Sequence, residues 1–226
     1  MSEKKLAVLF SGGKDSCLAL HKVVEQGHQV THLLNIVPKT RDSFMFHKPE
    51  LELLSQQAQE LGIELILMES KGEKEKELQD LIELIKLVQD KVEGIVVGGI
   101  ASSYQGNRIK KICDNLDLEF IAPLWDCSSE QVWKDLLDSG FKVILTKISC
   151  DGLSKEWLGR IIDSGVYKDL KEIADKYQFR TDFEGGEAES CVLFMPGFKK
   201  EIKIDFDIES EGEFRHFMKN IKIKNG

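Results

Sequence analysis

The clearest indication of the fold is the segment Leu6-Ala7-Val8-Leu9-Phe10-Ser11-Gly12-Gly13-Lys14-Asp15-Ser16. Its first five residues are a short continuous apolar run, which is typical of a strand buried on both faces of a parallel sheet. Directly after the polar hexapeptide, Cys17, Leu20 and Val24 recur at helical spacing and are expected to share one buried face. The stretch therefore predicts a strand, a glycine-containing turn and a helix in direct succession.

The same alternation continues over the first 125 residues. Four further apolar runs, separated by helical patterns, predict strands at residues 30–37, 63–68, 94–98 and 118–122. Strands that alternate with helices imply right-handed βαβ units. We therefore expect an α/β fold in which a five-stranded, mostly parallel, doubly wound sheet occupies residues 1–125. Such a sheet binds ligands at the carboxyl ends of its strands, near the point where the strand order reverses.

The pattern changes in residues 126–226, which we predict to form a smaller α+β domain. Helical spacing at residues 132–137 and 166–177 predicts two helices, and an apolar run at 143–148 predicts a strand. At residues 202–208, apolar and charged side chains alternate, which indicates antiparallel strands with one exposed face. The apolar side chains of this stripe belong either to the core or to an interface. An interface would form if an exposed strand edge there paired two copies as a homodimer.

The composition is that of a globular protein with an acidic surface. Of the 226 residues, 42% are apolar, which is enough for a buried core, and Asp plus Glu outnumber Lys plus Arg by 39 to 31. The net charge of −8 disfavours direct nucleic-acid binding, and no apolar run is long enough to span a membrane. The five cysteines include no C-x-x-C pair, so we expect reduced thiols and a cytoplasmic location.

The turn after the first strand has residue types that suit a phosphate group: Ser11, Gly12, Gly13, Lys14, Asp15 and Ser16. Glycines let backbone N–H groups approach phosphate oxygens, and the start of a helix adds positive potential. The lysine adds a point charge and the two serines add hydroxyl donors. The spacing is not that of the usual P-loop, because Val8 stands where its first glycine is needed and Asp15 where it needs Ser or Thr.

This hexapeptide resembles the pyrophosphate-binding loop of the N-type ATP pyrophosphatases, the PP-loop superfamily, whose fold is adenine nucleotide alpha hydrolase-like. The resemblance implies that ATP is cleaved between its α- and β-phosphates while the loop holds the departing pyrophosphate. A nucleophile such as ammonia then displaces AMP. Mg²⁺ is implied together with ATP, with Asp15 as its candidate contact, because the metal neutralises the developing phosphate charge. No metal site made by a cluster of protein side chains is expected.

Later segments narrow the resemblance to the diphthine–ammonia ligase family. They are Met45-Phe46-His47, the eleven residues from Gly98 to Arg108, Trp157-Leu158-Gly159-Arg160 and Glu184-Gly185-Gly186-Glu187-Ala188-Glu189-Ser190. These segments occur in the same order as in that family and are spread over nearly the whole chain. The chain resembles the compact, archaeal-style form of the family. The chain departs from the family pattern at Gly106, where arginine is common, and at residues 188–190, where Tyr-Glu-Thr is common.

The resemblance implies the last step of diphthamide synthesis. ATP would adenylate the carboxylate of diphthine, a modified histidine of translation elongation factor 2, and ammonium would supply the amide nitrogen. ATP would be bound by Ser11, Gly12, Gly13, Lys14, Asp15, Ser16, His47, Gly98 and Gly99. Substrate would be bound by Ser102, Tyr104, Gln105, Arg108, Glu184, Gly186 and Glu187. The implied catalytic residues are Lys14, Asp15, Glu187 and Glu189. The trimethylammonium group of diphthine and the ammonium ion are both cations, and acidic side chains suit them.

Other interpretations of the same residues stay open at this point. The acidic segment 184–189 also fits a solvated surface turn, and Tyr104, Gln105 and Arg108 also fit an exposed helix surface. Trp125 is expected in the core. The loop by itself also fits another PP-loop adenylating enzyme, such as a tRNA thiolase, or an ATP-binding module without catalysis.

Overall fold

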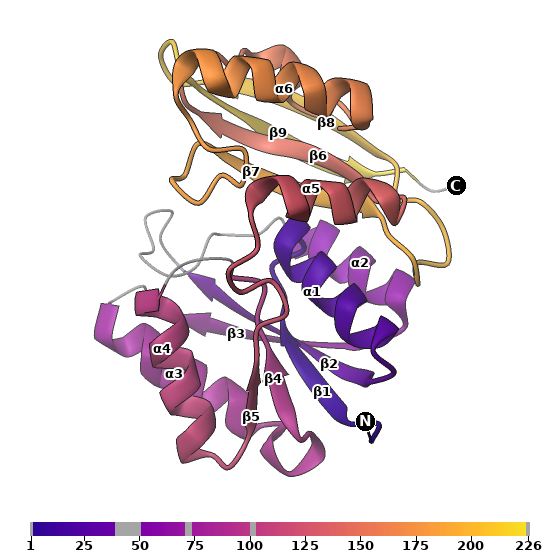
Figure 1. The fold of residues 1–226 in the computed structure, drawn as a ribbon, viewed down its shortest axis with the longest axis vertical. Coiled ribbons are helices and arrows are strands. Elements are labelled where there is room, and N and C mark those ends of the chain that lie inside the picture. The colour runs from indigo at the N-terminus through magenta and orange to yellow at the C-terminus, as the bar shows by residue number, and fades with distance from the viewer. Residues whose placement is uncertain (1, 39–50, 71–73, 100–102, 225–226) are drawn as a thin grey trace. The chain divides into compact units, whose positions relative to one another are not determined.

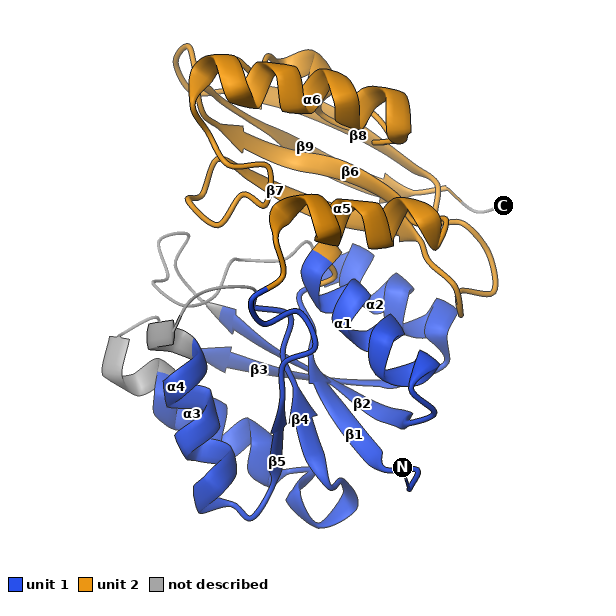
Figure 2. Ribbon diagram, in the orientation of Figure 1, with its two compact units in different colours: residues 1–11, 15–126 blue, residues 12–14, 127–226 orange. Residues whose placement is uncertain are grey.

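The computed structural model describes residues 2–38, 51–70, 74–99 and 103–224. Its backbone contacts divide the chain into two compact units (Figure 2). The first unit consists of Met1–Ser11 and Asp15–Asp126, and the second of Gly12–Lys14 and Cys127–Gly226. Three residues of the glycine loop thus belong with the C-terminal unit, which the local sequence pattern does not predict.

The first unit is built on a five-stranded parallel sheet (Figure 1). Its strands are β1 (Lys5–Leu9), β2 (Gln29–Pro38), β3 (Glu64–Ser70), β4 (Gly94–Val96) and β5 (Glu119–Ile121). They lie in the order β3-β2-β1-β4-β5, and every neighbouring pair is parallel. The strand order therefore reverses between β1 and β4, and the predicted doubly wound α/β sheet is confirmed.

Helices cover both faces of this sheet. They are α1 (Lys14–Glu25), α2 (Leu51–Leu61), α3 (Lys74–Lys86) and α4 (Ser103–Asn115), with a short 3-10 helix η1 (Gln89–Lys91) before β4. Figure 1 shows α1 and α2 on one face and α3 and α4 on the other. Because both faces are covered, the central residues of β1 (Leu6, Ala7 and Val8) are fully buried, which is why that strand is apolar throughout.

The first helix differs from the prediction at one position. Cys17 and Leu20 are buried as expected, but Val24 is 46% exposed. Val24 lies in the last turn of α1, where the neighbouring Val23 takes the buried side. The prediction of one buried face for all three residues was therefore wrong at the C-terminal end of the helix.

The second unit has a four-stranded antiparallel sheet in the order β7-β6-β9-β8. Its elements are α5 (Ser129–Asp138), β6 (Lys142–Ser149), the 3-10 helix η2 (Lys155–Trp157), α6 (Ser164–Tyr177), β7 (Ala188–Phe194), β8 (Ile204–Ser210) and β9 (Arg215–Ile223). The α+β character predicted for the C-terminal part is thereby confirmed.

Local side chains fix where both helices of this unit begin. The Ser128 hydroxyl accepts a hydrogen bond from the Gln131 amide at 3.2 Å, before α5. The Asp163 carboxylate accepts one from the Val166 amide at 2.9 Å, before α6. Such caps satisfy amide groups that have no partner within the helix.

The predicted apolar stripe at residues 202–208 divides between core and surface. Ile202 lies before β8 and is buried, whereas Ile208 lies within β8 and is exposed. Strand β8 is the last strand of the sheet, so its outer edge bonds to none of the described strands.

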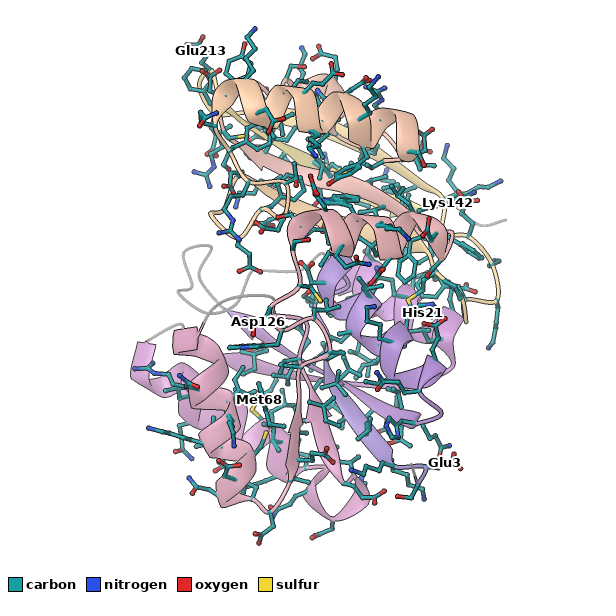
Figure 3. The ribbon with its side chains drawn as sticks, in the orientation of Figure 1. Glu3, His21, Met68, Asp126, Lys142 and Glu213 are labelled. Carbon is teal, nitrogen blue, oxygen red and sulfur yellow. The ribbon has the colours of Figure 1, made fainter. Side chains whose placement is uncertain are left out.

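The acidic side chains contribute to the surface of both units. Figure 3 shows Glu3 and Glu213 pointing away from the ribbon, and both are exposed. Among the described residues, no helix combines the length and the apolar character needed to cross a bilayer.

Candidate functional site

The glycine loop lies at the carboxyl end of β1, next to the reversal in strand order. The hydroxyl groups of Ser11 and Ser16 are 3.1 Å apart, and the Ser11 amide donates to the Ser16 hydroxyl oxygen at 3.3 Å. A Cβ atom on Gly98 would lie only 2.6 Å from the Ser16 amide nitrogen. Only glycine therefore allows the end of β4 to come this close to the start of α1.

An apolar cavity of about 180 Å³ lies in the first unit beside this loop. It is lined by Leu9, Phe10, Ser11, Leu34, Asn35, Ile36, Leu81, Leu84, Val97, Gly98, Gly99, Gly106, Ile109 and Trp125. Small-molecule sites commonly combine such an apolar lining with a few polar groups that fix orientation. Its lining is suited to a flat, mostly apolar ring system.

Two residues that line the cavity were not predicted to belong to a ligand site. Trp125 was expected in the core, but it is half-buried and forms part of the cavity wall, and a Cβ on Gly106 would overlap its ring at 2.5 Å. Asn35 lies in β2, where its side-chain amide donates to the Phe10 carbonyl at 2.8 Å. The buried amide oxygen of Asn35 accepts no hydrogen bond from the described residues. A polar residue inside an apolar strand is the signal that could have identified it.

Lys14 is almost completely buried, with 2% of its surface exposed. Its ammonium group donates to the Asp182 carbonyl oxygen at 2.6 Å and lies 5.5 Å from the centre of the Phe183 ring. Its backbone amide donates to the Ser190 hydroxyl at 3.1 Å. A buried ammonium group requires such acceptors, so these contacts hold Lys14 within the second unit.

The backbone of the loop is attached to the same unit. The Val192 amide, in β7, donates to the Gly12 carbonyl at 3.1 Å. The glycine loop therefore contacts β7, whose first two residues are the last two of the acidic segment, although Lys14 and Ser190 are 176 residues apart. Sequence reasoning placed the loop correctly at the end of β1, but it had no means of finding these contacts.

Asp182, whose backbone carbonyl binds Lys14, also stabilises its own turn through its side chain. Its side chain is 1% exposed and accepts hydrogen bonds from the Arg180 guanidinium, the Ser129 hydroxyl and the Glu184 amide. Burial by itself would raise the pKa of the Asp182 carboxyl, but these hydrogen bonds and the charge of Arg180 outweigh it and lower the pKa below its usual value. Asp182 is therefore a buried carboxylate stabilised by its partners.

The predicted acidic cluster separates into groups with different environments. Glu184 is exposed, and Gly186 lies in the exposed turn beside it. Glu189 accepts a hydrogen bond from the Lys147 ammonium at 2.6 Å, because the register of β6 and β7 sets these two residues opposite each other. One oxygen of Glu187 accepts weakly from the Arg180 amide at 3.3 Å. The other is buried and accepts no hydrogen bond from the described residues.

Several predicted site residues are placed less completely. His47 and Ser102 lie outside the described residues. Tyr104 and Gln105 lie in the first turn of α4, where only the backbone is described, and Arg108 is half-buried one turn later. Gly13 and Asp15 are half-buried beside Lys14, and Gly99 lines the cavity.

Cys113 and Cys150 do not have the environment of reactive thiols. Burial is the main cause that raises the pKa of Cys113 to about 11. Burial, together with the charge of Glu187, raises the pKa of Cys150 to about 11 as well. Thiolate chemistry requires a lowered pKa, so neither residue suits a sulfur carrier. No group of three or more His, Cys, Asp or Glu side chains able to hold a metal ion occurs among the described residues.

Comparison with known proteins covers both units. A family model described as the diphthamide synthase N-terminal domain matches residues 4–120, and one described as the diphthamide synthase C-terminal domain matches residues 128–225. The diphthine–ammonia ligase of Mus musculus is 32% identical over 223 residues, and that of Bos taurus is 33% identical over 222. Each alignment covers 89% of this chain and 83% of the relative.

Two further similarities cover a smaller share of the other protein. The diphthine–ammonia ligase of Schizosaccharomyces pombe is 32% identical over 216 residues, which cover 88% of this chain and 36% of that protein. Among solved structures, the U34-tRNA thiolase NcsA from Methanococcus maripaludis has a TM-score of 0.39 at 12% identity, over 60% of this chain and 57% of that one. This structural similarity is too weak to inform the function.

The environment of Asp182 predicts how stability depends on pH. Because the pKa of Asp182 is lowered in the folded state, its contribution is complete above the unfolded pKa of about 4 and is lost as the pH falls through the folded pKa. We expect Asp182→Asn to lower the free energy of unfolding by about 1.5–3 kcal/mol at pH 7, and by less at pH 3. Urea denaturation of both proteins at the two pH values measures this difference.

The exposed Asp175 in the same unit provides the control. Asp175→Asn should leave the free energy of unfolding unchanged at pH 7. Equal stability of the wild type and Asp182→Asn at pH 7, or a difference that persists undiminished at pH 3, would contradict the prediction.

Proposed function

The chain belongs to the diphthamide synthase family, and from this premise we propose that it converts diphthine on translation elongation factor 2 to diphthamide. The reaction would be an ATP-dependent amidation that forms a C–N bond and releases AMP and pyrophosphate. One observation carries the proposal: a single turn of the second unit holds both the lysine of the phosphate loop and the acidic side chain of Glu187. The group proposed to bind pyrophosphate and the group proposed to bind a cation are thus both hydrogen-bonded to the same turn.

The chemistry requires two steps, because a carboxylate is a poor electrophile and must be activated before ammonia can attack it. An oxygen of the diphthine carboxylate would attack the α-phosphorus of ATP, and the bond to the pyrophosphate leaving group would break. Ammonia would then attack the acyl carbon, and AMP would leave. In the first step, negative charge accumulates on the pyrophosphate, where Lys14 and the backbone amides of the loop are proposed to stabilise it.

The adenine ring would occupy the cavity of the first unit. The apolar lining suits a flat heterocycle, and the unsatisfied amide oxygen of Asn35 provides an acceptor for an exocyclic amino group. Ser11, the first residue of the hexapeptide, is part of the cavity lining.

The residues present are compatible with Mg²⁺ bound together with ATP. In such sites, the ion is commonly held by one or two carboxylates together with substrate phosphates and water. The half-buried Asp15, at the start of α1, is the carboxylate proposed for this role. The metal would neutralise charge on the phosphates.

The two glutamates of the acidic segment are proposed to have different roles. Glu189 already pairs with Lys147, which makes it a support for β7. Glu187 has a buried carboxylate oxygen without a described hydrogen-bond donor, and is therefore the group proposed to receive a cation. That cation is either ammonium, from which Glu187 would help to remove a proton, or the trimethylammonium group of diphthine.

The remaining assignments follow from the same proposal. Arg108 would pair with a phosphate or with the substrate carboxylate, and Ser102, Tyr104, Gln105, Glu184 and Gly186 would contact the diphthine-bearing factor. The reaction would take place in the cytoplasm with free ammonium and without direct nucleic-acid binding. The outer edge of β8 is the segment through which two copies would pair if the protein forms a homodimer.

The proposal is tested by reconstitution. The protein is incubated with magnesium-ATP, ammonium and elongation factor 2 bearing diphthine, and each component is omitted in turn. We expect AMP and amidated factor to form in equal amounts, and only in the complete mixture. Pyrophosphate release that requires tRNA and a sulfur donor would indicate a thiolase instead, and ATP binding without hydrolysis would indicate a non-catalytic module.

Replacement of Lys14 tests the loop. We expect Lys14→Ala to fold normally and to lower the rate of pyrophosphate release by about 10²-fold or more, because one charged donor to the leaving group is lost. Lys134→Ala is the matched control, since Lys134 lies in α5 and pairs with Asp138 at an exposed position. Pyrophosphate release at the wild-type rate in Lys14→Ala would refute the assignment of the loop.

Replacement of the two glutamates tests their separate roles. We expect Glu187→Gln to lose amide formation, because the cation-binding charge is removed while the side-chain shape is kept. Pyrophosphate release in a single turnover should persist if the bound cation is ammonium, and should fall if it is the trimethylammonium group of diphthine. Glu189→Gln should retain amide formation and lose some thermal stability, because its pair with Lys147 is lost. A rise in the KM for ammonium in Glu187→Gln would identify ammonium as the bound cation. Normal turnover of diphthine by Glu187→Gln would exclude the role proposed for it.

A further inference from the structure

The turn formed by Arg180, Thr181 and Asp182 makes hydrogen bonds to helix α5 and within itself through both backbone and side-chain groups. We infer that the ion pair between Arg180 and Asp182 holds both Lys14 and Glu187 in place. Arg180 and Asp182 are therefore positioning residues for both steps of the reaction. The two reaction steps named in this inference rest on the proposed function. The placement of Lys14 and Glu187 by the turn is a separate property that can be measured without any turnover.

The Asp182 carboxylate is fully occupied by protein donors. Its Oδ1 atom accepts from Arg180 Nε at 2.9 Å and from the Glu184 amide at 3.1 Å. Its Oδ2 atom accepts from Arg180 Nη2 at 2.5 Å and from the Ser129 hydroxyl at 2.9 Å. Four donors match the acceptor capacity of a carboxylate, so this buried side chain has no position left for a substrate. Its contribution must therefore act through the groups that it holds.

The backbone of the same turn makes the two contacts that matter for the reaction. The carbonyl oxygen of Asp182 accepts from Lys14 Nζ at 2.6 Å. Two residues earlier, the amide of Arg180 donates to Glu187 Oε1 at 3.3 Å. A change in the backbone path between residues 180 and 182 would move both the ammonium group and the carboxylate. The turn thus couples the group proposed for pyrophosphate to the group proposed for the cation.

Helix α5 gives the turn a rigid support. The indole Nε1 of the fully buried Trp133 donates to the Thr181 carbonyl at 2.8 Å, and Ser129, one turn earlier in α5, donates to Asp182. The Arg180 guanidinium closes the turn from the solvent side, with 58% of its side chain exposed. A buried carboxylate that loses its cationic partner is strongly destabilised in place, so removal of the guanidinium should allow the turn to shift.

Small displacements at this turn would have large effects on the rate. A misplacement of reacting groups by about 1 Å can cost on the order of 10²-fold in activity. Arg180→Gln removes the guanidinium from a largely exposed position, so the fold should persist while the turn loosens. Arg180→Lys keeps a cation that reaches the same carboxylate, and should restore part of the lost function.

The test compares Arg180→Gln, Arg180→Lys and Asp182→Asn with the wild type by nuclear magnetic resonance of ¹⁵N-labelled lysine side chains. A hydrogen-bonded, buried ammonium group exchanges its protons slowly, so Lys14 should give a protected signal, which is assigned by its absence in Lys14→Ala. We expect that signal to disappear or shift in Arg180→Gln and Asp182→Asn, and to be retained in Arg180→Lys. The control is Arg215→Gln, which breaks an exposed pair with Glu211 in the same unit and should not change the signal.

Steady-state kinetics provides the second measurement. We expect two KM values to rise together, by about 10-fold each, in Arg180→Gln, because both positioned groups move. They are the KM for ATP and the KM for the cationic substrate that Glu187 binds, which is either ammonium or the diphthine-bearing factor. A purely structural defect would reduce the fraction of active protein, and would lower kcat while leaving both KM values unchanged. Arg180→Lys should recover part of both KM changes, and Arg215→Gln should have wild-type constants.

The outcomes separate this inference from the proposed function. An unprotected Lys14 signal in the wild type, or a protected signal that is unchanged in Arg180→Gln and Asp182→Asn, would overturn the positioning role. Unchanged KM values in Arg180→Gln would overturn it as well. If the wild type formed no diphthamide, the proposed function would fail, but the resonance experiment would still decide whether the turn positions Lys14.

Discussion

Burial of a lysine ammonium group is tolerable only when hydrogen-bond acceptors surround it, and Lys14 is 2% exposed. The Asp182 carbonyl is one of those acceptors, and it lies 168 residues further along the chain. This requirement explains why Gly12–Lys14 group with the C-terminal unit although they directly follow β1. The chemistry proposed for the loop therefore depends on acceptors that lie far from it in the sequence.

The first unit follows the general rule for open parallel sheets. The strand order reverses between β1 and β4, and the apolar cavity and the glycine loop both lie at the carboxyl ends of these strands. Close backbone approach at Gly98 brings β4 against the first turn of α1. The second unit contributes carboxylates with distinct environments. Asp182 is saturated with donors and Glu189 is paired with Lys147, whereas Glu187 keeps one buried oxygen without a described donor.

Much of the fold could be predicted because its determinants are local. A continuous apolar run such as residues 6–10 reports that both faces of a strand are buried, and the hexapeptide after it reports a turn that leads into a helix. Amphipathic spacing is less reliable near the ends of helices, as Val24 shows, because a neighbouring residue can take the buried side. The resemblance to the diphthine–ammonia ligase family, carried by ordered motifs, identified the family to which both units belong.

Local patterns and ordered motifs were enough to predict the parallel sheet, the position of the phosphate loop, the antiparallel C-terminal part and the family. They could not predict which acidic groups are occupied or which residues surround the loop, because these depend on contacts between distant residues. Glu187 and Glu189 are equivalent in sequence, but strand register sets Lys147 opposite Glu189 alone. Periodicity records which local face is buried, whereas the pairing of charges and carbonyls far apart in the chain depends on register and on turns. Those relations exist only once the chain has folded.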